Sequence, residues 1–276
     1  MHLLPEWFTQ SSPVLQALLA GLFTWGVTAL GATLVFFTQR VARGLLDGML
    51  GFAAGVMLAA SVFSLILPAV TYAEAQGMTG WFPPAMGFLL GGIFIRLLDY
   101  LLPHLHLYEP IEHAEGLSTT WKKTTLLILA ITLHNLPEGL AVGVSFGAAH
   151  VGLDIPGATT LNAAIILALG IGIQNFPEGL AVALPLRAEG LSPLKAFWYG
   201  QLSALIEPVA AMIGAGAVTL VTPMLPYTMG FAAGAMIYVI VEELIPEAQY
   251  HGHTDIATFS TLIGFVVMMV LDVALS

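Results

Sequence analysis

Eight long apolar runs constrain the fold of this chain more than any other feature. Each is close to the 20 residues that an α-helix needs to cross the hydrocarbon core of a bilayer. Only 9% of the residues are charged, against about 25% in soluble domains. We therefore expect a single polytopic membrane domain over residues 1–276, all α-helical, with eight transmembrane helices. The expected spans are 14–37, 49–72, 84–102, 124–149, 158–186, 196–221, 226–245 and 256–275.

The composition excludes several classes of function. Seven Lys and Arg residues against 17 acids argue against nucleic-acid binding. The chain has no cysteine, which removes disulfides and thiolate metal sites. No positive segment precedes the first apolar run, so no cleaved signal peptide is expected. A formal net charge of −10 fits the handling of cations.

The basic residues predict the orientation in the membrane. With eight spans, all of them fall on one side, in or beside the loops between spans 1 and 2, 3 and 4, and 5 and 6. By the positive-inside rule that side is cytoplasmic, and both termini lie outside the cytoplasm. The basic residues are Arg40, Arg43, Arg96, Lys122, Lys123, Arg187 and Lys195.

A six-residue motif occurs twice, once in the fourth span and once in the fifth. The copies read His134-Asn-Leu-Pro-Glu138-Gly and Gln174-Asn-Phe-Pro-Glu178-Gly. A lone Asp at the centre of a membrane helix costs about 2.5–3.5 kcal/mol on insertion scales, and a Glu should cost a similar amount. Residues three and four apart share a helix face, so each motif presents its first two polar residues beside its Glu. A metal cation is the ligand that best explains two buried acids in the same frame.

The residue types of the motifs indicate which metal they would hold. One imidazole with carboxylates suits Zn²⁺, Fe²⁺ or Mn²⁺, whereas oxygen ligands alone would suit Mg²⁺ or Ca²⁺. Glu207, before a proline in the sixth span, is a candidate third carboxylate for the same cavity. Each motif proline frees a backbone carbonyl and favours a kink at the ligands.

A second repeat relates the second and seventh spans. Gly51-Phe-Ala-Ala-Gly55 recurs as Gly230-Phe-Ala-Ala-Gly234, and Met57 matches Met236 in the same register. Because the two spans run in opposite directions, the repeat is inverted. Inverted repeats and proline-interrupted central helices are typical of secondary transporters with a site at the bilayer midplane.

The segment at about 103–121 is the longest predicted loop, on the cytoplasmic side. It is either a solvated polar linker or a weak metal-catching segment. Its histidines and acids are His104, His106, His113, Glu109, Glu112 and Glu115.

Acids near the cytoplasmic ends of two spans predict an exit route. Asp47 begins the second span, and Glu242 and Glu243 end the seventh, where two acids oppose the negative end of the helix dipole. Glu247, His251 and His253 are expected in the loop that follows. The alternative is a solvated, acid-rich helix end. Ser64 and Asp272 complete the set of predicted pathway residues.

These motifs resemble those of the ZIP family (Zrt-, Irt-like proteins) of divalent metal transporters, and of its bacterial GufA-like branch. The resemblance rests on His134–Gly139 and Gln174–Gly179, on residues 50–67, 205–208 and 229–247, and on the eight-span length. It implies an inverted repeat of helices 1–3 and 6–8 around a central helix 4–5 pair. It also implies transport of Zn²⁺, and of cations such as Cd²⁺, Fe²⁺ and Mn²⁺, into the cytoplasm by alternating access. An elevator-like motion, a homodimer and a place in the bacterial inner membrane follow from the same resemblance.

The resemblance also implies a binuclear metal site and no other cofactor. Its first position would use Met57, His134, Glu138, Gln174 and Glu178, and its second Asn135, Glu138, Asn175, Glu178 and Glu207. From the residues alone, Met57 is more often a packing residue. Some relatives have Asp where this chain has Asn175, and a neutral amide removes a charge from the second position.

Three other functions remain open from the residues. An intramembrane zinc hydrolase would need an open water position on the metal, often among several histidines. His134 is the only histidine within an expected span, and the chain has no HExxH motif, so we expect no enzyme. A cation/proton exchanger would use the carboxylates without tight metal binding. A purely structural membrane protein would leave the paired buried acids unexplained.

Overall fold

The computed structural model describes residues 5–38, 41–105, 111–152, 155–188 and 190–275. Within these ranges, eight helices are long and apolar enough to cross a membrane. A short helix, α1 (Glu6–Thr9), precedes them, and η3 (Ile111–His113) lies between the third and fourth. The first four spans are α2 (Pro13–Ala32) with η1 (Thr33–Phe36), α3 (Arg43–Ala60) with η2 (Ser61–Ile66) and α4 (Leu67–Ala75), α5 (Phe82–Leu101), and α6 (Lys123–Val151). The last four are α7 (Leu161–Ala188), α8 (Pro193–Leu202) with η4 (Ser203–Leu205) and α9 (Ile206–Leu220), η5 (Thr222–Met224) with α10 (Leu225–Val239), η6 (Ile240–Leu244) and α11 (Ile245–Gln249), and α12 (Thr254–Leu275).

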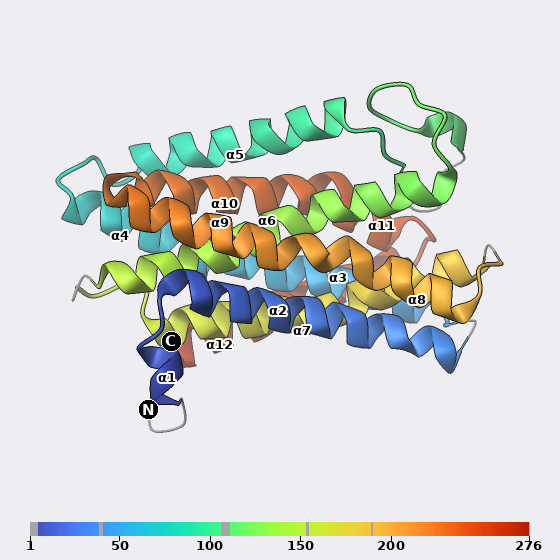
Figure 1. Cartoon of the computed structure of the whole chain (residues 1–276), viewed down its shortest axis with the longest axis horizontal. Helices are drawn as coiled ribbons and strands as arrows, with labels where there is room; N and C mark the ends of the chain where they lie inside the picture. The colour runs from blue at the N-terminus through green and yellow to red at the C-terminus, as the bar shows by residue number, and fades with distance from the viewer. Residues whose placement is uncertain (1–4, 39–40, 106–110, 153–154, 189, 276) are drawn as a thin grey trace.

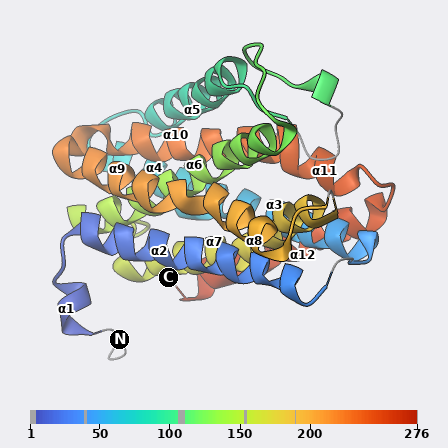
Figure 2. The same ribbon diagram turned by 45° about the vertical axis from the view of Figure 1, so that its right-hand side comes forward.

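The helices that carry the duplicated motif lie at the centre of the bundle. In their most apolar windows, α7 is 78% buried and α6 is 67% buried, against 28% for α5 and 22% for α12. Figure 1 shows α5 along one edge over α10, and Figure 2 shows the same arrangement from another side. The closest pairings are α3 with α12, α5 with α10, α6 with α9 and α2 with α7.

The two copies of the inverted repeat use their glycines in the same way, because each copy packs closely against a neighbouring helix through these residues. A side chain at Gly51 or Gly55 of α3 would collide with the backbone of α12, at Ala257 and Thr261. In the second copy, a side chain at Gly230 or Gly234 of α10 would collide with the backbone of α5, at Pro84 and Phe88. The glycines of the two copies therefore perform the same packing role in two different helix pairs.

Two π-helical turns occupy equivalent places in the two copies. The turn η2 (Ser61–Ile66) interrupts the second span, and η6 (Ile240–Leu244) interrupts the seventh. Ser64 and Glu243 each lie thirteen residues after the first glycine of their copy. Such turns are frequent at functional sites in helices. Here η2 carries the predicted pathway residue Ser64, and η6 carries two of them, Glu242 and Glu243.

Two predicted boundaries, at helix ends that are expected to be cytoplasmic, are wrong. Glu242 and Glu243 do not end the seventh span, because the helix resumes as α11 (Ile245–Gln249) with a proline in its first turn. A proline at that position breaks little hydrogen bonding, so it does not stop the span. Glu247 is therefore helical rather than in a loop. Asp47 lies inside α3 (Arg43–Ala60) and is buried, not at the helix start.

Three residues singled out in the sequence, Arg40, His106 and Glu109, lie outside the described residues.

Candidate metal transport site

The two motif helices bring their polar side chains into the interior of the bundle. Both α6 and α7 run without a break through the motif prolines, Pro137 and Pro177. Glu207 reaches the same interior from the first turn of α9. The buried polar residues of the site are Asn135, Glu138, Gln174, Asn175, Glu178 and Glu207, and none is more than 8% exposed.

Several oxygen atoms of this site have no hydrogen-bond partner among the described residues. Both carboxylate oxygens of Glu138 and one of Glu178 are in this state, as are the amide oxygens of Gln174 and Asn135. Gln174 lies close enough to Glu138 to interact with it, but no hydrogen bond of good geometry joins them. A buried acceptor without a partner costs about 1–3 kcal/mol, so this arrangement is expensive unless a cation binds.

The remaining polar atoms of the site are joined by hydrogen bonds. The Asn175 side-chain nitrogen donates to both Glu207 oxygens, at 2.9 Å each, and also to the backbone oxygen of Thr24 at 3.2 Å. The Gln174 nitrogen donates to the Asn175 side-chain oxygen at 3.2 Å. Asn135 donates to the backbone oxygen of Ile131 at 2.8 Å, which leaves its own oxygen available.

Three carboxyl groups of the site lie within electrostatic reach of one another. Glu178 is repelled by Glu138 and Glu207, and Glu207 is repelled by Glu138. Like charges in a buried site raise the free energy of the empty state, and a divalent cation relieves that repulsion. The electrostatics therefore favour a cation, in agreement with the unpartnered oxygens.

Met57 comes to the interior from a different helix. It lies on α3, fully buried, within the main apolar cluster of the molecule. This placement fits packing as well as ligation, so its role as a metal ligand stays a prediction.

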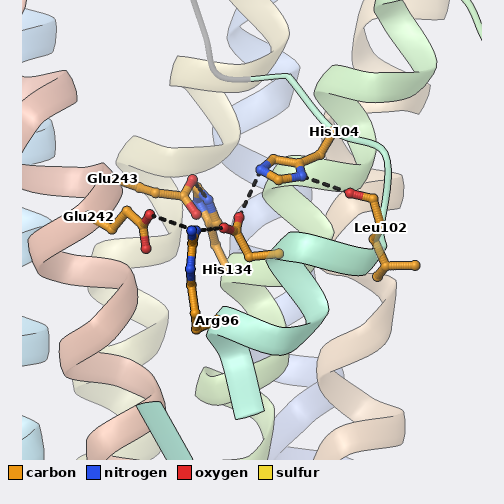
Figure 3. Close-up of polar contacts among 7 residues, drawn as sticks. Arg96, Leu102, His104, His134, Glu242 and Glu243 are labelled. Atoms are coloured by element: carbon orange, nitrogen blue, oxygen red, sulfur yellow. Dashed lines mark hydrogen bonds and ion pairs between the residues drawn. The ribbon is translucent and has the colours of Figure 1, made fainter. Parts of the chain in front are cut away.

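His134 connects the central motif to the seventh span. Its Nε2 atom contacts the Glu243 carboxylate, and both side chains are largely buried. Figure 3 shows these two residues beside each other. Glu242, the neighbour of Glu243 in the chain, lies 3.7 Å from the Arg96 guanidinium instead. The structure thus separates two acids that the sequence analysis treated alike.

A network of ion pairs lies at the C-terminal end of α5, near the contact of His134 with Glu243. Arg96 binds Asp99 at 2.7 Å, and the Nε2 atom of His104 lies 2.8 Å from the other Asp99 oxygen. The Nδ1 atom of His104 lies 2.8 Å from the Leu102 backbone oxygen (Figure 3). The potential ligand atoms of Asp99, His104 and Glu115 all lie within 4.8 Å of one another. Part of the predicted loop is therefore folded against α5 and is not simply a solvated linker.

Asp47 is held by the two histidines that precede α12. Its carboxylate lies 2.8 Å from Nδ1 of His253 and 3.4 Å from Nδ1 of His251. The structure brings these three residues together, and all three are predicted to lie on the cytoplasmic side.

Ser64 and Asp272 form a second buried polar contact, on the opposite side of the bundle from Asp47 along the second span. The Ser64 hydroxyl donates to Asp272 at 2.9 Å, and both residues are buried. They line a cavity of about 220 Å³ together with Thr71 and Thr159. Ser64 lies on η2 and Asp272 near the end of α12, so this contact joins the second and eighth spans.

Asp99 is the residue that the sequence analysis missed, although a signal was present. Gly91 packs against Phe231 as Gly264 packs against Phe52, and each phenylalanine follows the first glycine of its repeat. Asp99 and Asp272 each lie eight residues after the glycine of their own helix. Extending the inverted repeat to the third and eighth spans would have placed Asp99 opposite Asp272.

Comparison with known proteins identifies the family of this chain. The model of the ZIP Zinc transporter family matches residues 109–272, which include both motifs and Glu207. The chain is 43% identical to "Zinc transporter ZIP11" of Homo sapiens, over 96% of this chain and 98% of the relative. It is 41% identical to "Zinc transporter GufA" of Myxococcus xanthus, over 94% and 98%, and 41% identical to "Zinc transporter ZIPB" of Bordetella bronchiseptica, over 94% and 81%. Relatives of this similarity along nearly the whole chain, together with the family match and the buried motif pair, show that this chain belongs to the ZIP family.

Proposed function

We propose that this protein carries divalent transition metal cations, Zn²⁺ first among them, across the membrane into the cytoplasm by alternating access. The observation that carries the proposal is the set of five buried oxygen atoms without hydrogen-bond partners, contributed by both motifs among the described residues. A structural core would satisfy these atoms internally. A transporter must instead leave them available to its substrate.

The ligand types support a transition metal. The first cation position would use the carboxylates of Glu138 and Glu178, the oxygen of Gln174, the imidazole of His134, and Met57. Nitrogen and oxygen ligands together suit Zn²⁺, Fe²⁺ and Mn²⁺. Zinc is favoured because the relatives above are named as zinc transporters.

The polar contacts on either side of the central site provide a route for the cation. Ser64 and Asp272 would receive the cation outside, and Glu243 would accept it from His134 on the inner side. Asp47, next to His251 and His253, would follow on the way to the cytoplasm. This direction assumes that both termini lie outside the cytoplasm, in the inner membrane of a bacterium.

Alternating access would need part of the bundle to move. The close pairings of α6 with α9 and of α2 with α7 define one group of helices, while α3 with α12 and α5 with α10 define another. Met57 belongs to the second group and the two motifs to the first. An elevator-like displacement of one group, with the other forming a homodimer, is compatible with this division. Light scattering of the purified protein would test the dimer.

Uptake into proteoliposomes tests the function. Zn²⁺, Cd²⁺, Fe²⁺ and Mn²⁺ would be supplied outside, with the pH gradient set to zero, inward or outward. We expect Zn²⁺ uptake that needs no pH gradient. Proton release without metal accumulation would instead support a cation/proton exchanger, and metal-dependent peptide hydrolysis without flux would support a hydrolase.

A further inference from the structure

The polar groups of the central site fall into two sets that differ in their availability. The oxygens of Glu138, Gln174, Asn135 and one of Glu178 have no hydrogen-bond partner in the described part of the chain. In contrast, both oxygens of Glu207 accept hydrogen bonds from Asn175. The available set matches most of the first cation position, whereas the Glu207 side of the second position is already occupied.

The orientation of the Asn175 amide is determined by its neighbours. Its nitrogen faces three acceptors, which are the two Glu207 oxygens and the Thr24 backbone oxygen. Its oxygen accepts from the Gln174 nitrogen. Turning the amide over would bring its oxygen against the Glu207 carboxylate and its nitrogen against another nitrogen donor, which loses every one of these bonds.

The NH₂ group of an asparagine side chain donates hydrogen bonds and does not bind cations. For a cation to reach Glu207 from this side, the Asn175 nitrogen would have to be displaced from both carboxylate oxygens. An aspartate at the same position would present a negative oxygen there instead of an N–H donor.

We propose that the Asn175 amide takes the place of a second metal ion, so that the central site of this protein holds a single cation. Glu207 is then a positioning residue rather than a ligand. It binds Asn175, Asn175 binds Gln174, and the Gln174 oxygen is left for the transported ion. This inference rests on the proposed function and departs from the binuclear site that the family resemblance implies.

Metal stoichiometry tests the proposal. Equilibrium dialysis of the purified full-length protein with Zn²⁺ alone, followed by elemental analysis, would compare wild type with Glu207→Gln, Asn175→Asp and the double variant. Binding elsewhere on the chain, for example at Asp99 and His104, is common to all four proteins and cancels in the differences.

We expect Glu207→Gln to bind as many ions as wild type, because the glutamine oxygen still accepts from Asn175. Its affinity should fall about 5-fold, the effect of losing one hydrogen bond. Asn175→Asp should bind one ion more than wild type, and the double variant should lose that ion again. Glu74→Gln, the same change at an exposed position of α4, should alter neither quantity.

Loss of one ion in Glu207→Gln relative to wild type would overturn the proposal, because it would make Glu207 a ligand of a second metal. An unchanged ion count in a folded Asn175→Asp protein would also overturn it. If Asn175→Asp does not fold, the comparison of wild type with Glu207→Gln decides alone. Failure of the proposed function looks different, since wild-type protein would then show no Zn²⁺ uptake in proteoliposomes, whatever the ion counts of the variants.

Discussion

At the residue scale, the stability of this site depends on buried acceptor atoms that have no hydrogen-bond partner among the described residues. Glu138 is fully buried, and neither of its carboxylate oxygens has a hydrogen-bond partner among the described residues. Such a group lowers the free energy of unfolding of the empty protein. Replacing the Glu138 carboxylate should therefore reduce transport while it leaves the stability of the metal-free protein unchanged or higher.

Glu138→Gln and Glu178→Gln should each reduce Zn²⁺ uptake to background, because each removes a charge from the cation position. In metal-free buffer, their melting temperatures should equal or exceed that of wild type, since a neutral amide is less costly to bury than an unpaired carboxylate. Initial uptake rates in proteoliposomes and thermal unfolding in detergent would check both. Uptake near the wild-type rate in either variant would show that the cation position is misassigned.

Glu242 and Glu243 illustrate how adjacent residues can have separate roles. Glu243 contacts His134, whereas Glu242 lies beside Arg96 and is one-third exposed. Glu243→Gln should lower the maximal uptake rate with little change in the external half-saturation concentration, because the outer entry is intact. Glu242→Gln is the matched control and should have the smaller effect on rate. A raised half-saturation concentration at unchanged maximal rate in Glu243→Gln would contradict a role in inward release.

At the scale of helices, glycine contacts determine which spans pair. Gly55 of α3 packs directly on the backbone of α12 at Thr261, and Gly234 of α10 packs in the same way on α5. A single methyl group at either glycine would collide with a backbone carbonyl oxygen. Backbone atoms cannot rotate aside as a side chain can, so the two helices would have to separate.

Gly55→Ala should therefore lower the melting temperature and the yield of folded protein. Gly216→Ala on α9 is the control, because a methyl group there meets no atom within 4 Å. It should be neutral or stabilising, since alanine is favoured over glycine in a helix by about 1 kcal/mol. Equal destabilisation by both changes would mean that the loss comes from helix propensity or handling and not from the contact with α12.

The sequence predicted the eight membrane helices correctly and placed the two motifs on helices, because both depend on local spacing. Span length follows from apolar runs, and the shared face of His134 and Glu138 follows from helical periodicity. The contact of His134 with Glu243 and the bonds of Asn175 with Glu207 join residues that are far apart in the chain. No local period encodes such contacts, so the sequence did not reveal which acids remain available. The seventh span extends beyond its predicted end at residue 245, because the helix resumes as α11 with a proline in its first turn.

At the scale of the whole molecule, the distribution of charge implies one orientation in the membrane. All seven basic residues lie in or beside three connections between spans, which the positive-inside rule places in the cytoplasm. The proposed exit route through Glu243 and Asp47 depends on this orientation. If it were inverted, the same contacts would describe export.

The chain has no cysteine, so single introduced cysteines can report the orientation without removing native ones. Thr79 precedes α5 on the predicted outer side, and Ser118 precedes α6 on the predicted cytoplasmic side; both are exposed. In intact cells, a membrane-impermeant maleimide should label Thr79→Cys but not Ser118→Cys. Both should be labelled after the membrane is opened with detergent, which controls for the reactivity of each thiol. Labelling of Ser118→Cys alone in intact cells would invert the topology, and the site described here would then carry metal out of the cytoplasm.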